Sequence, residues 1–356
     1  VTLGALNEAL EPHGLFFPID LGADPQVGGM VATNCGGARL IRYGDVRDNL
    51  LGLEVALPDG SLVDGLKSLR KDNTGLDLRQ LYCGTSGAYG VITRAVLRLA
   101  GLPRQRVSAL VALKSGDAAL KLLAHLEATA SEALTAFEAI SRGALEATLR
   151  HGANLRDPFP GGVPAYAVIV EFTSTFPESV LDLAAVLEGT LGQFMEEKDE
   201  DQEVLDVLVS GAGDFWEIRH HISESLRHDG HVLALDLSVP RSRLAEFTRV
   251  ATEQLAETHP FVTVCDFGHW GDGGTHFNLV WDPETAPAEV PALTRELQDA
   301  LYVLCVKSFG GSFSAEHGVG PHNRRYHERF IAPELHRLHR ALKREVDPEG
   351  RLGHRD

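Results

Sequence analysis

Two short stretches of the chain hold most of the residues that could do chemistry. In Cys265 to Val280 (CDFGHWGDGGTHFNLV), His269 and His276 lie on either side of a glycine-rich turn. Further on, the run SFSAEHGVG places Glu316 directly before His317. Two imidazoles and a carboxylate suit a divalent cation such as Zn²⁺ or Mn²⁺ and leave coordination positions open for a substrate. The alternative is that these histidines are ordinary hydrogen-bonded core groups, but their number and clustering favour the metal site.

A cation held in this way indicates chemistry on an alcohol. It would bind the hydroxyl and carboxylate of a 2-hydroxy acid together and lower the pKa of the hydroxyl, and His317 would take the proton. The hydride left on the carbon needs a redox cofactor, because no amino-acid side chain accepts one. Arg219 suits the substrate carboxylate, since a guanidinium matches its geometry; a surface ion pair is the equally weighted alternative.

The elements that would position these residues follow from the spacing of apolar side chains. Residues 263–269 and 276–281 predict a β-hairpin, and strand alternation places His276 and Asn278 on the same side of it. From residue 107 to residue 258, short strands alternate with helical segments. This pattern predicts an α+β architecture with an antiparallel sheet covered by helices.

The part before Leu102-Pro103-Arg104 has a different character, and we place a domain boundary there. Residues 51–57 and 61–64 flank Pro58-Asp59-Gly60 and predict a hairpin. Glycine-rich tracts would let the main chain approach a flat or phosphorylated ligand, because no Cβ intervenes. Tight turns are the equally weighted alternative for these tracts.

Composition narrows the class of protein. The 356 residues suffice for two domains, and 44% hydrophobic with 23% charged residues is ordinary for a well-cored globular chain. A formal charge of -17 argues against nucleic acid and anionic membranes as partners. Four widely spaced cysteines predict reduced thiols and a cytoplasmic location, and no apolar run is long enough for a membrane span. Because the chain opens at Val1 with no initiator Met, we expect a longer protein.

Four segments together carry a family resemblance. They are PIDLGADPQVGGMVATNCGGARLIRYG, SLRKDNTGLDLRQLYCGTSGAYGVIT, GHWGDGGTHFN and SAEHGVG, and they follow one another in this order along nearly the whole chain. The chain thereby resembles the FAD-linked D-2-hydroxy acid dehydrogenases of the vanillyl-alcohol oxidase-like superfamily. The resemblance implies oxidation of a D-2-hydroxy acid (2-hydroxyglutarate, lactate or similar) to the 2-oxo acid, with hydride passing to flavin N5. It also implies a separate electron acceptor, either an electron-transfer flavoprotein or a quinone-linked partner, and is compatible with a homodimer.

The resemblance also implies a domain plan. Residues 1–103 would be the C-terminal part of an FAD-binding domain whose pyrophosphate-cradling loop lies before Val1. Residues 104–331 would be a substrate-binding cap domain. Residues 332–356 would supply a C-terminal helix that returns to the FAD domain.

Individual residues receive roles from the same resemblance. His269, His276 and Glu316 would be the metal ligands, and Arg219, Asn278 and His317 would act on the substrate. The residues that would contact FAD lie in the glycine-rich tracts: Gly28, Gly29, Thr33, Asn34, Gly36, Gly37, Tyr43, Gly87, Gly90, Val91 and Ile92.

The sequence departs from the family pattern at three positions besides its beginning. Ala234, in LALDLSVP, stands where the family often has a lysine that contacts a substrate carboxylate. Gly353 stands at the asparagine of a common L-N-P ending, and Gly274 replaces a usual asparagine in the metal hairpin. Two other classes of protein therefore stay open: a metal-dependent hydrolase without flavin, and a non-catalytic relative.

Overall fold

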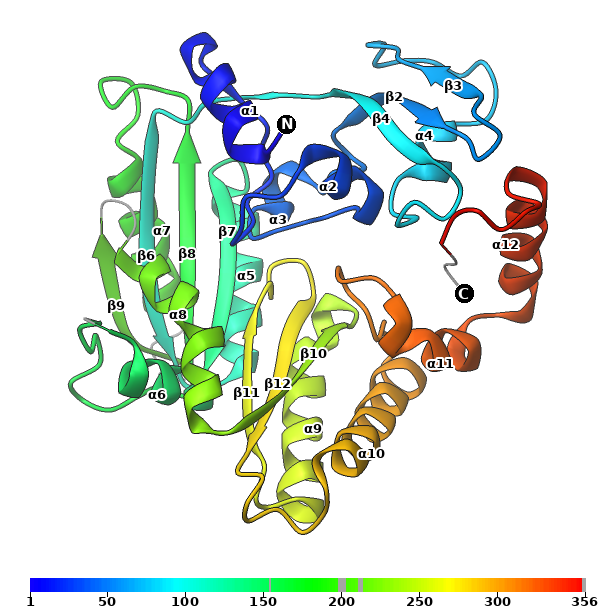
Figure 1. Ribbon diagram of the computed structural model, residues 1–356. Helices are drawn as coiled ribbons and strands as arrows, with labels where there is room; N and C mark the ends of the chain where they lie inside the picture. Colours follow the sequence, from blue (N-terminus) through cyan, green and yellow to red (C-terminus); the bar gives the residue numbers. More distant parts are fainter. Residues whose placement is uncertain (154, 198–202, 211–213, 354–356) are drawn as a thin grey trace. The chain divides into compact units, whose positions relative to one another are not determined.

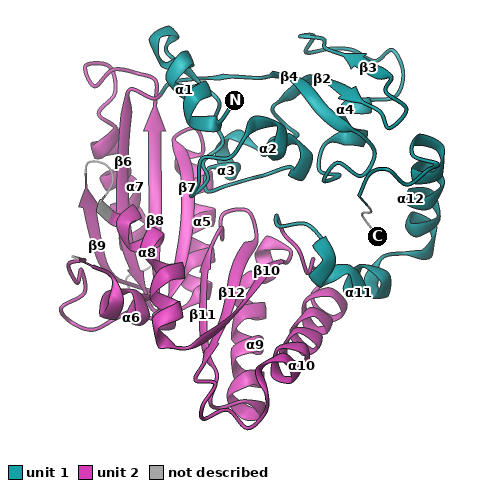
Figure 2. Cartoon of the chain, viewed as in Figure 1, with its two compact units in different colours: residues 1–102, 316–356 teal, residues 103–315 magenta. Residues whose placement is uncertain are grey.

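The computed structural model describes residues 1–153, 155–197, 203–210 and 214–353. The chain divides into two compact units, which Figure 2 colours separately: unit 1 is Val1–Leu102 with Glu316–Asp356, and unit 2 is Pro103–Ala315. The first division falls at the Leu102-Pro103-Arg104 boundary. The second falls after Ala315, earlier than the expected boundary after residue 331. Ala315 still donates its amide to the Asp236 carbonyl oxygen in the sheet of unit 2, at 3.2 Å.

Unit 2 is built on a seven-stranded antiparallel sheet with strand order β10-β12-β11-β7-β8-β6-β9 (Figure 1). The predicted antiparallel sheet with helical cover is therefore confirmed, and strand β9 is an addition that the sequence pattern did not indicate. The strands are β6 (Gln105–Leu113), β7 (Leu134–Ser141), β8 (Tyr166–Ser174), β9 (Val204–Ser210), β10 (His231–Ser238), β11 (Thr263–Gly268) and β12 (Gly274–Trp281).

Two groups of helices pack on this sheet. Helices α6 (Arg142–His151) and α8 (Asp214–Asp229) pack against each other and belong to one group. Helix α5 (Gly116–Ala130) contacts both α7 (Leu183–Glu197) and α9 (Leu244–Thr258) in the other group. Ser115 caps α5 by accepting a hydrogen bond from the Ala118 amide, and a stripe of buried leucines faces its neighbours. Helix α10 (Val290–Val303) runs into a π-turn at Leu304–Ser308.

The strand register determines which side chains share a face of the sheet. Directly opposed residues of an antiparallel pair point to the same face, and alternate residues repeat it. Asp236 lies opposite His276, and Phe267 also lies opposite His276. Because Phe267 pairs with Ile140 on β7, Glu138 faces the same side. One face of the sheet therefore gathers acidic, imidazole and aromatic side chains from four adjacent strands.

Unit 1 contains a three-stranded antiparallel sheet of order β3-β2-β4 and a small β1-β5 pair. Its apolar core includes Phe17, Met30, Val31 and Leu53, and Leu342 with other residues packs against it from the C-terminal helix. The strands are β1 (Leu15–Phe16), β2 (Leu50–Ala56), β3 (Leu62–Gly65), β4 (Val91–Leu97) and β5 (Ala100–Gly101). The α-helices are α1 (Leu3–Leu10), α2 (Val27–Thr33), α3 (Leu40–Tyr43), α4 (Leu78–Tyr82), α11 (Gly320–Phe330) and α12 (Pro333–Val346).

The hairpin around Pro58-Asp59-Gly60 is confirmed as the β2–β3 pair. The first part of the glycine-rich tract forms helix α2 rather than tight turns. The buried side chains of Met30 and Val31 anchor one side of this short helix in the core, which compensates for the poor helix propensity of its glycines. Within the described part of the chain, no helix is both long and apolar enough to cross a membrane.

Candidate functional site

One group of side chains among the described residues could hold a metal ion. Its members are Asp236, His276, Glu316 and His317, and their candidate ligand atoms all lie within 4.8 Å of one another. Asp236 and His276 meet because β10 and β12 pair in register. Glu316 and His317 follow Ala315, whose amide is bonded to the Asp236 carbonyl oxygen. Two carboxylates and two imidazoles are hard to borderline donors that fit Zn²⁺ or Mn²⁺.

A closed ring of contacts lies on the same face of unit 2. Arg219, on α8, donates from Nε to Oε2 of Glu138 at 2.7 Å, and Nδ1 of His269 lies 2.9 Å from Oε1 of the same carboxylate. The Arg219 guanidinium carbon lies 4.5 Å from the centroid of the Phe267 ring. The ring centroids of Phe267 and His276 are 5.2 Å apart, and those of His276 and His269 are 5.1 Å apart. Glu138 thus connects the predicted substrate arginine with a predicted metal histidine.

Glu138 is 1% exposed, so its charge has little access to water. Burial acts to raise the pKa of Glu138, but the electrostatic attraction and hydrogen bonds of His269 and Arg219 outweigh it and lower the pKa to about 2. The carboxylate is therefore ionised at neutral pH. A buried anion of this kind is tolerated only with cationic or hydrogen-bonding partners, and Glu138 has one on each oxygen.

Helix α8 is attached to the sheet at a second point by another buried glutamate. Trp216 Nε1 donates to Oε2 of Glu171 at 3.1 Å, and Glu171, on β8, is 0% exposed. Trp216 and Arg219 are three residues apart and therefore lie on the same face of the helix. These two polar contacts fix the rotation of α8 and, with it, the direction of the Arg219 side chain.

The metal-ligand residues predicted from the sequence are only partly brought together. His276 and Glu316 lie in the four-residue group, and His317, predicted as the proton acceptor, lies there as well. His269 is outside that group and contacts Glu138, and Asp236 takes the fourth place. Asn278, predicted to contact substrate, is buried and donates from Nδ2 to the Cys265 carbonyl oxygen at 3.3 Å.

In unit 1 the two predicted FAD-contacting tracts lie side by side. The amides of Gly84 and Ser86 donate to the carbonyl oxygens of Val31 and Ala32, at 3.0 and 2.7 Å. The φ angle is positive at Ser86 (53°), where a side chain makes that conformation unfavourable. Such local strain persists only where surrounding contacts impose it, so the turn has a defined shape beside α2.

The predicted FAD-contacting residues have different surroundings. Gly28 and Gly29 are exposed on α2, and a Cβ at Gly29 would meet nothing within 4 Å, so a flat ring system could approach the backbone there. Gly37 and Gly90 are buried instead, and a Cβ would meet Asp20 O at 2.1 Å or Val55 Cγ1 at 2.3 Å. The packing of the protein itself thus explains these two glycines. The remaining predicted contacts are partly or fully exposed, apart from buried Gly36: Thr33, Asn34, Tyr43, Gly87, Val91 and Ile92.

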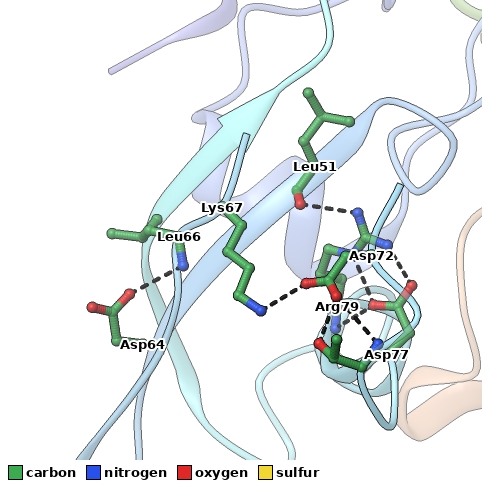
Figure 3. Close-up of polar contacts among 8 residues, drawn as sticks. Leu51, Asp64, Leu66, Lys67, Asp72, Asp77 and Arg79 are labelled. Carbon is green, nitrogen blue, oxygen red and sulfur yellow. Dashed lines mark hydrogen bonds and ion pairs between the residues drawn. The ribbon is translucent and has the colours of Figure 1, made fainter. Parts of the chain in front are cut away.

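Unit 1 also has a hollow of about 190 Å³ between the β2–β3 hairpin and the loop that leads into α4. Figure 3 shows that ion pairs fix this loop: Lys67 Nζ lies 2.6 Å from Asp72 Oδ2, and Arg79 Nη2 lies 2.6 Å from Asp77 Oδ2. Arg79 Nη1 also donates to the Leu51 carbonyl oxygen at 2.9 Å. The volume is below the roughly 300–1,000 Å³ of pockets for organic ligands, so we do not assign it to the flavin.

The cysteine side chains belong neither to the candidate metal-binding group nor to the ring of contacts around Glu138. All four are free thiols, as the sequence predicts, and three of them are buried. Burial raises the pKa of Cys83 to about 11 and that of Cys265 and Cys305 to about 12. These three thiols are protonated at neutral pH and poorly suited to nucleophilic catalysis.

Comparison with known proteins identifies the family. Residues 102–355 match the family described as FAD linked oxidases, C-terminal domain, and residues 1–65 match an FAD binding domain. The chain belongs to the FAD-linked oxidases. The predicted resemblance to flavin-linked dehydrogenases is thereby confirmed, and the FAD-linked families disfavour a hydrolase without flavin.

Named relatives of this FAD-linked oxidase chain act on D-2-hydroxy acids. It is 34% identical over 363 residues to the mitochondrial D-2-hydroxyglutarate dehydrogenase of Bos taurus, covering 99% of this chain and 62% of that protein. It is 30% identical over 368 residues to a D-2-hydroxyglutarate–pyruvate transhydrogenase of Saccharomyces cerevisiae, covering 99% of this chain and 71% of that protein. The chain thus spans about three fifths of the bovine relative's length.

Solved structures support the fold. Two structures of alkyldihydroxyacetonephosphate synthase superpose with TM-scores of 0.65 and 0.67, at 16% and 15% sequence identity. Each comparison covers 98% of this chain and 62% of the other. At this level of identity the likeness concerns the fold alone.

Three buried carboxylates of unit 2 were not predicted from the sequence. Asp236 and Glu138 each stand within an apolar strand, in LALDLS and LTAFEAIS, and Glu171 does so in VIVEFTS. A lone carboxylate in an apolar strand is expected to be buried and paired. That signal could have identified all three residues before the structure was known.

Proposed function

We propose that this chain is part of an FAD-dependent oxidoreductase that oxidises a D-2-hydroxy acid to the 2-oxo acid. The observation that carries the proposal is a donor set for a divalent cation beside a partly buried arginine that Glu138 orients, in a chain of the FAD-linked oxidase family. The domain plan predicted from the sequence is part of this proposal: residues 1–103 would contribute to the flavin-binding domain, residues 104–331 would form the cap, and residues 332–356 would return to the flavin-binding domain.

Asp236, His276 and Glu316 would hold the cation, and the residues present fit it, because two carboxylates and an imidazole offer oxygen and nitrogen donors at close range. The exposed backbone of Gly28 and Gly29 fits a flat cofactor. When bound, the cation would lower the pKa of the substrate hydroxyl, and FAD would accept the two electrons of the oxidation.

The residues of the chain would bind and orient the substrate. Arg219 would pair with its carboxylate through the terminal guanidinium nitrogens, because Nε is held by Glu138. His317, with a side chain 64% exposed and Nε2 3.9 Å from Glu316 Oε1, would accept the hydroxyl proton. Asn278 would help to position His276, because the Asn278 side-chain amide donates to the His276 carbonyl oxygen at 3.2 Å.

An absorbance experiment tests the proposal. The full-length protein should carry a flavin spectrum that a D-2-hydroxy acid bleaches under anaerobic conditions, and a chelator should abolish the bleaching. His317→Ala should prevent bleaching while flavin content is unchanged. A colourless full-length protein that cannot be reconstituted with FAD would refute the proposal and favour a non-catalytic relative. Re-oxidation by an electron-transfer flavoprotein or by a quinone would then identify the class of electron acceptor.

A further inference from the structure

Glu138 does not contact the substrate in the proposed function, yet it is a buried charged residue with a close partner on each of its oxygens. It lies on β7 and is 1% exposed, with Oε2 2.7 Å from Arg219 Nε and Oε1 2.9 Å from His269 Nδ1. The loop that carries His269 is anchored to the residue before Glu138, because the Gly271 amide donates to the Phe137 carbonyl oxygen at 3.2 Å. A buried carboxylate is unfavourable without partners, so its two contacts should be maintained together.

The contact with His269 has a chemical consequence. A carboxylate can only accept hydrogen bonds, so Nδ1, which lies 2.9 Å from Glu138 Oε1, is the nitrogen that would carry the proton of a neutral imidazole. The remaining nitrogen, Nε2, is then the one with the lone pair, which is the form that binds a cation. Histidines that bind metals commonly donate their other ring nitrogen to a carboxylate, which fixes both tautomer and ring orientation.

The contact with Arg219 also orients a side chain of the candidate site. The hydrogen bond from Nε fixes the plane of the guanidinium, and the Phe267 ring supports one face at 4.5 Å. The terminal nitrogens keep the fork geometry that matches a carboxylate. One buried anion therefore orients an anion-binding group and a cation-binding group.

We propose that Glu138 is a positioning residue that fixes the Nδ1–H tautomer of His269 and the orientation of Arg219 at the same time. His269, whose ring centroid lies 5.1 Å from that of His276, would thereby offer a further nitrogen donor to the cation held by Asp236, His276 and Glu316. This inference rests on the proposed function, which supplies both the cation that His269 would bind and the substrate carboxylate that Arg219 would bind. Its geometric part concerns this chain's own side chains and can be tested without turnover.

The decisive variant is Glu138→Gln, which keeps the shape of the side chain. With its oxygen accepting from Arg219, the amide NH₂ would face His269 Nδ1, which must then accept. The imidazole proton would move to Nε2 and block the lone pair. Zn²⁺ affinity of the full-length protein, measured by competition with a chelator, should fall about 10–100-fold, the range typical for loss of such a partner.

Glu171→Gln is the matched control. Glu171 is also a buried glutamate that holds α8 to the sheet, but it accepts from Trp216. Its replacement should leave Zn²⁺ affinity unchanged within about twofold. An equal loss in both variants would show that general loosening of α8 explains the effect, and that result would overturn the positioning role.

Nitrogen NMR of the ¹⁵N-histidine-labelled, metal-free protein at pH 8 tests the tautomer of His269 separately from cation binding. The His269 signals are assigned because they are absent from the spectrum of His269→Gln. The wild type should show His269 protonated on Nδ1, and Glu138→Gln should move the proton to Nε2. A wild-type ring protonated on Nε2, or on both nitrogens, would overturn the inference. If the wild type shows the Nδ1–H form but binds no Zn²⁺, the cation part of the proposed function fails and the role of Glu138 in setting the tautomer stands.

Discussion

Asp266 gives a prediction whose magnitude follows from the structure. This β11 residue is 2% exposed and faces away from the candidate site, and the Tyr166 hydroxyl donates to its Oδ2 at 3.3 Å. Burial raises the pKa of Asp266 from 3.8 to about 6, although hydrogen bonds from neighbouring groups, Tyr166 among them, act to lower it. The carboxyl therefore binds its proton more tightly in the folded protein than in the unfolded chain.

The direction of the pH dependence follows from linkage. Well below pH 3.8 the carboxyl is protonated in both states and does not penalise folding. As pH rises through the window between 3.8 and about 6, the unfolded chain loses its proton first, and the folded state loses relative stability. Because one pH unit corresponds to about 1.4 kcal/mol, the ionised carboxylate destabilises the folded protein by about 3 kcal/mol at pH 7.

Asp266→Asn tests this value, because asparagine keeps the acceptor oxygen without the charge. The difference in unfolding free energy between variant and wild type should rise by about 2.4 kcal/mol, in favour of the variant, between pH 4 and pH 7. Chemical denaturation at half-unit pH steps measures this difference. The contributions of the other titrating groups are the same in both proteins and cancel in it. A difference that stays constant within about 0.5 kcal/mol over this range would refute the argument.

Three further predictions concern the site residues. Gly37→Ala should destabilise the protein by more than about 2 kcal/mol in thermal denaturation, because φ is 91° there and a Cβ would lie 2.1 Å from a backbone oxygen. The exposed Gly29→Ala should preserve the melting temperature and reduce only flavin retention. Asp236→Asn and His276→Ala should each weaken Zn²⁺ binding by at least about tenfold in chelator competition, and unchanged affinity in either would remove that residue from the ligand set. Ala234→Lys should raise kcat/KM for D-2-hydroxyglutarate relative to D-lactate by about tenfold or more, because a charge-assisted hydrogen bond contributes about 1.5–3 kcal/mol; an unchanged ratio would exclude this position from substrate recognition.

Local patterns were sufficient for much of unit 2. The hairpin that carries His276 was predictable because glycines in the turn and period-two alternation are local signals, and the structure has it as β11 and β12. Helix α2 was not predictable in the same way. Its sequence, VGGMVAT, has low helix propensity, and only the burial of Met30 and Val31 in the core of unit 1 stabilises it as a helix.

The sequence by itself determined the chemical types available to this protein: histidines beside a glutamate, an arginine suited to a carboxylate, and glycine tracts typical of a family that uses FAD. Only the tertiary structure decided which of these residues meet. Asp236 joins His276 because two strands far apart in the chain pair in one register, and Glu138 bridges Arg219 and His269 because a helix and a loop pack on the same strand. Contacts of this kind depend on register and packing, which the spacing of residues along the chain does not encode locally.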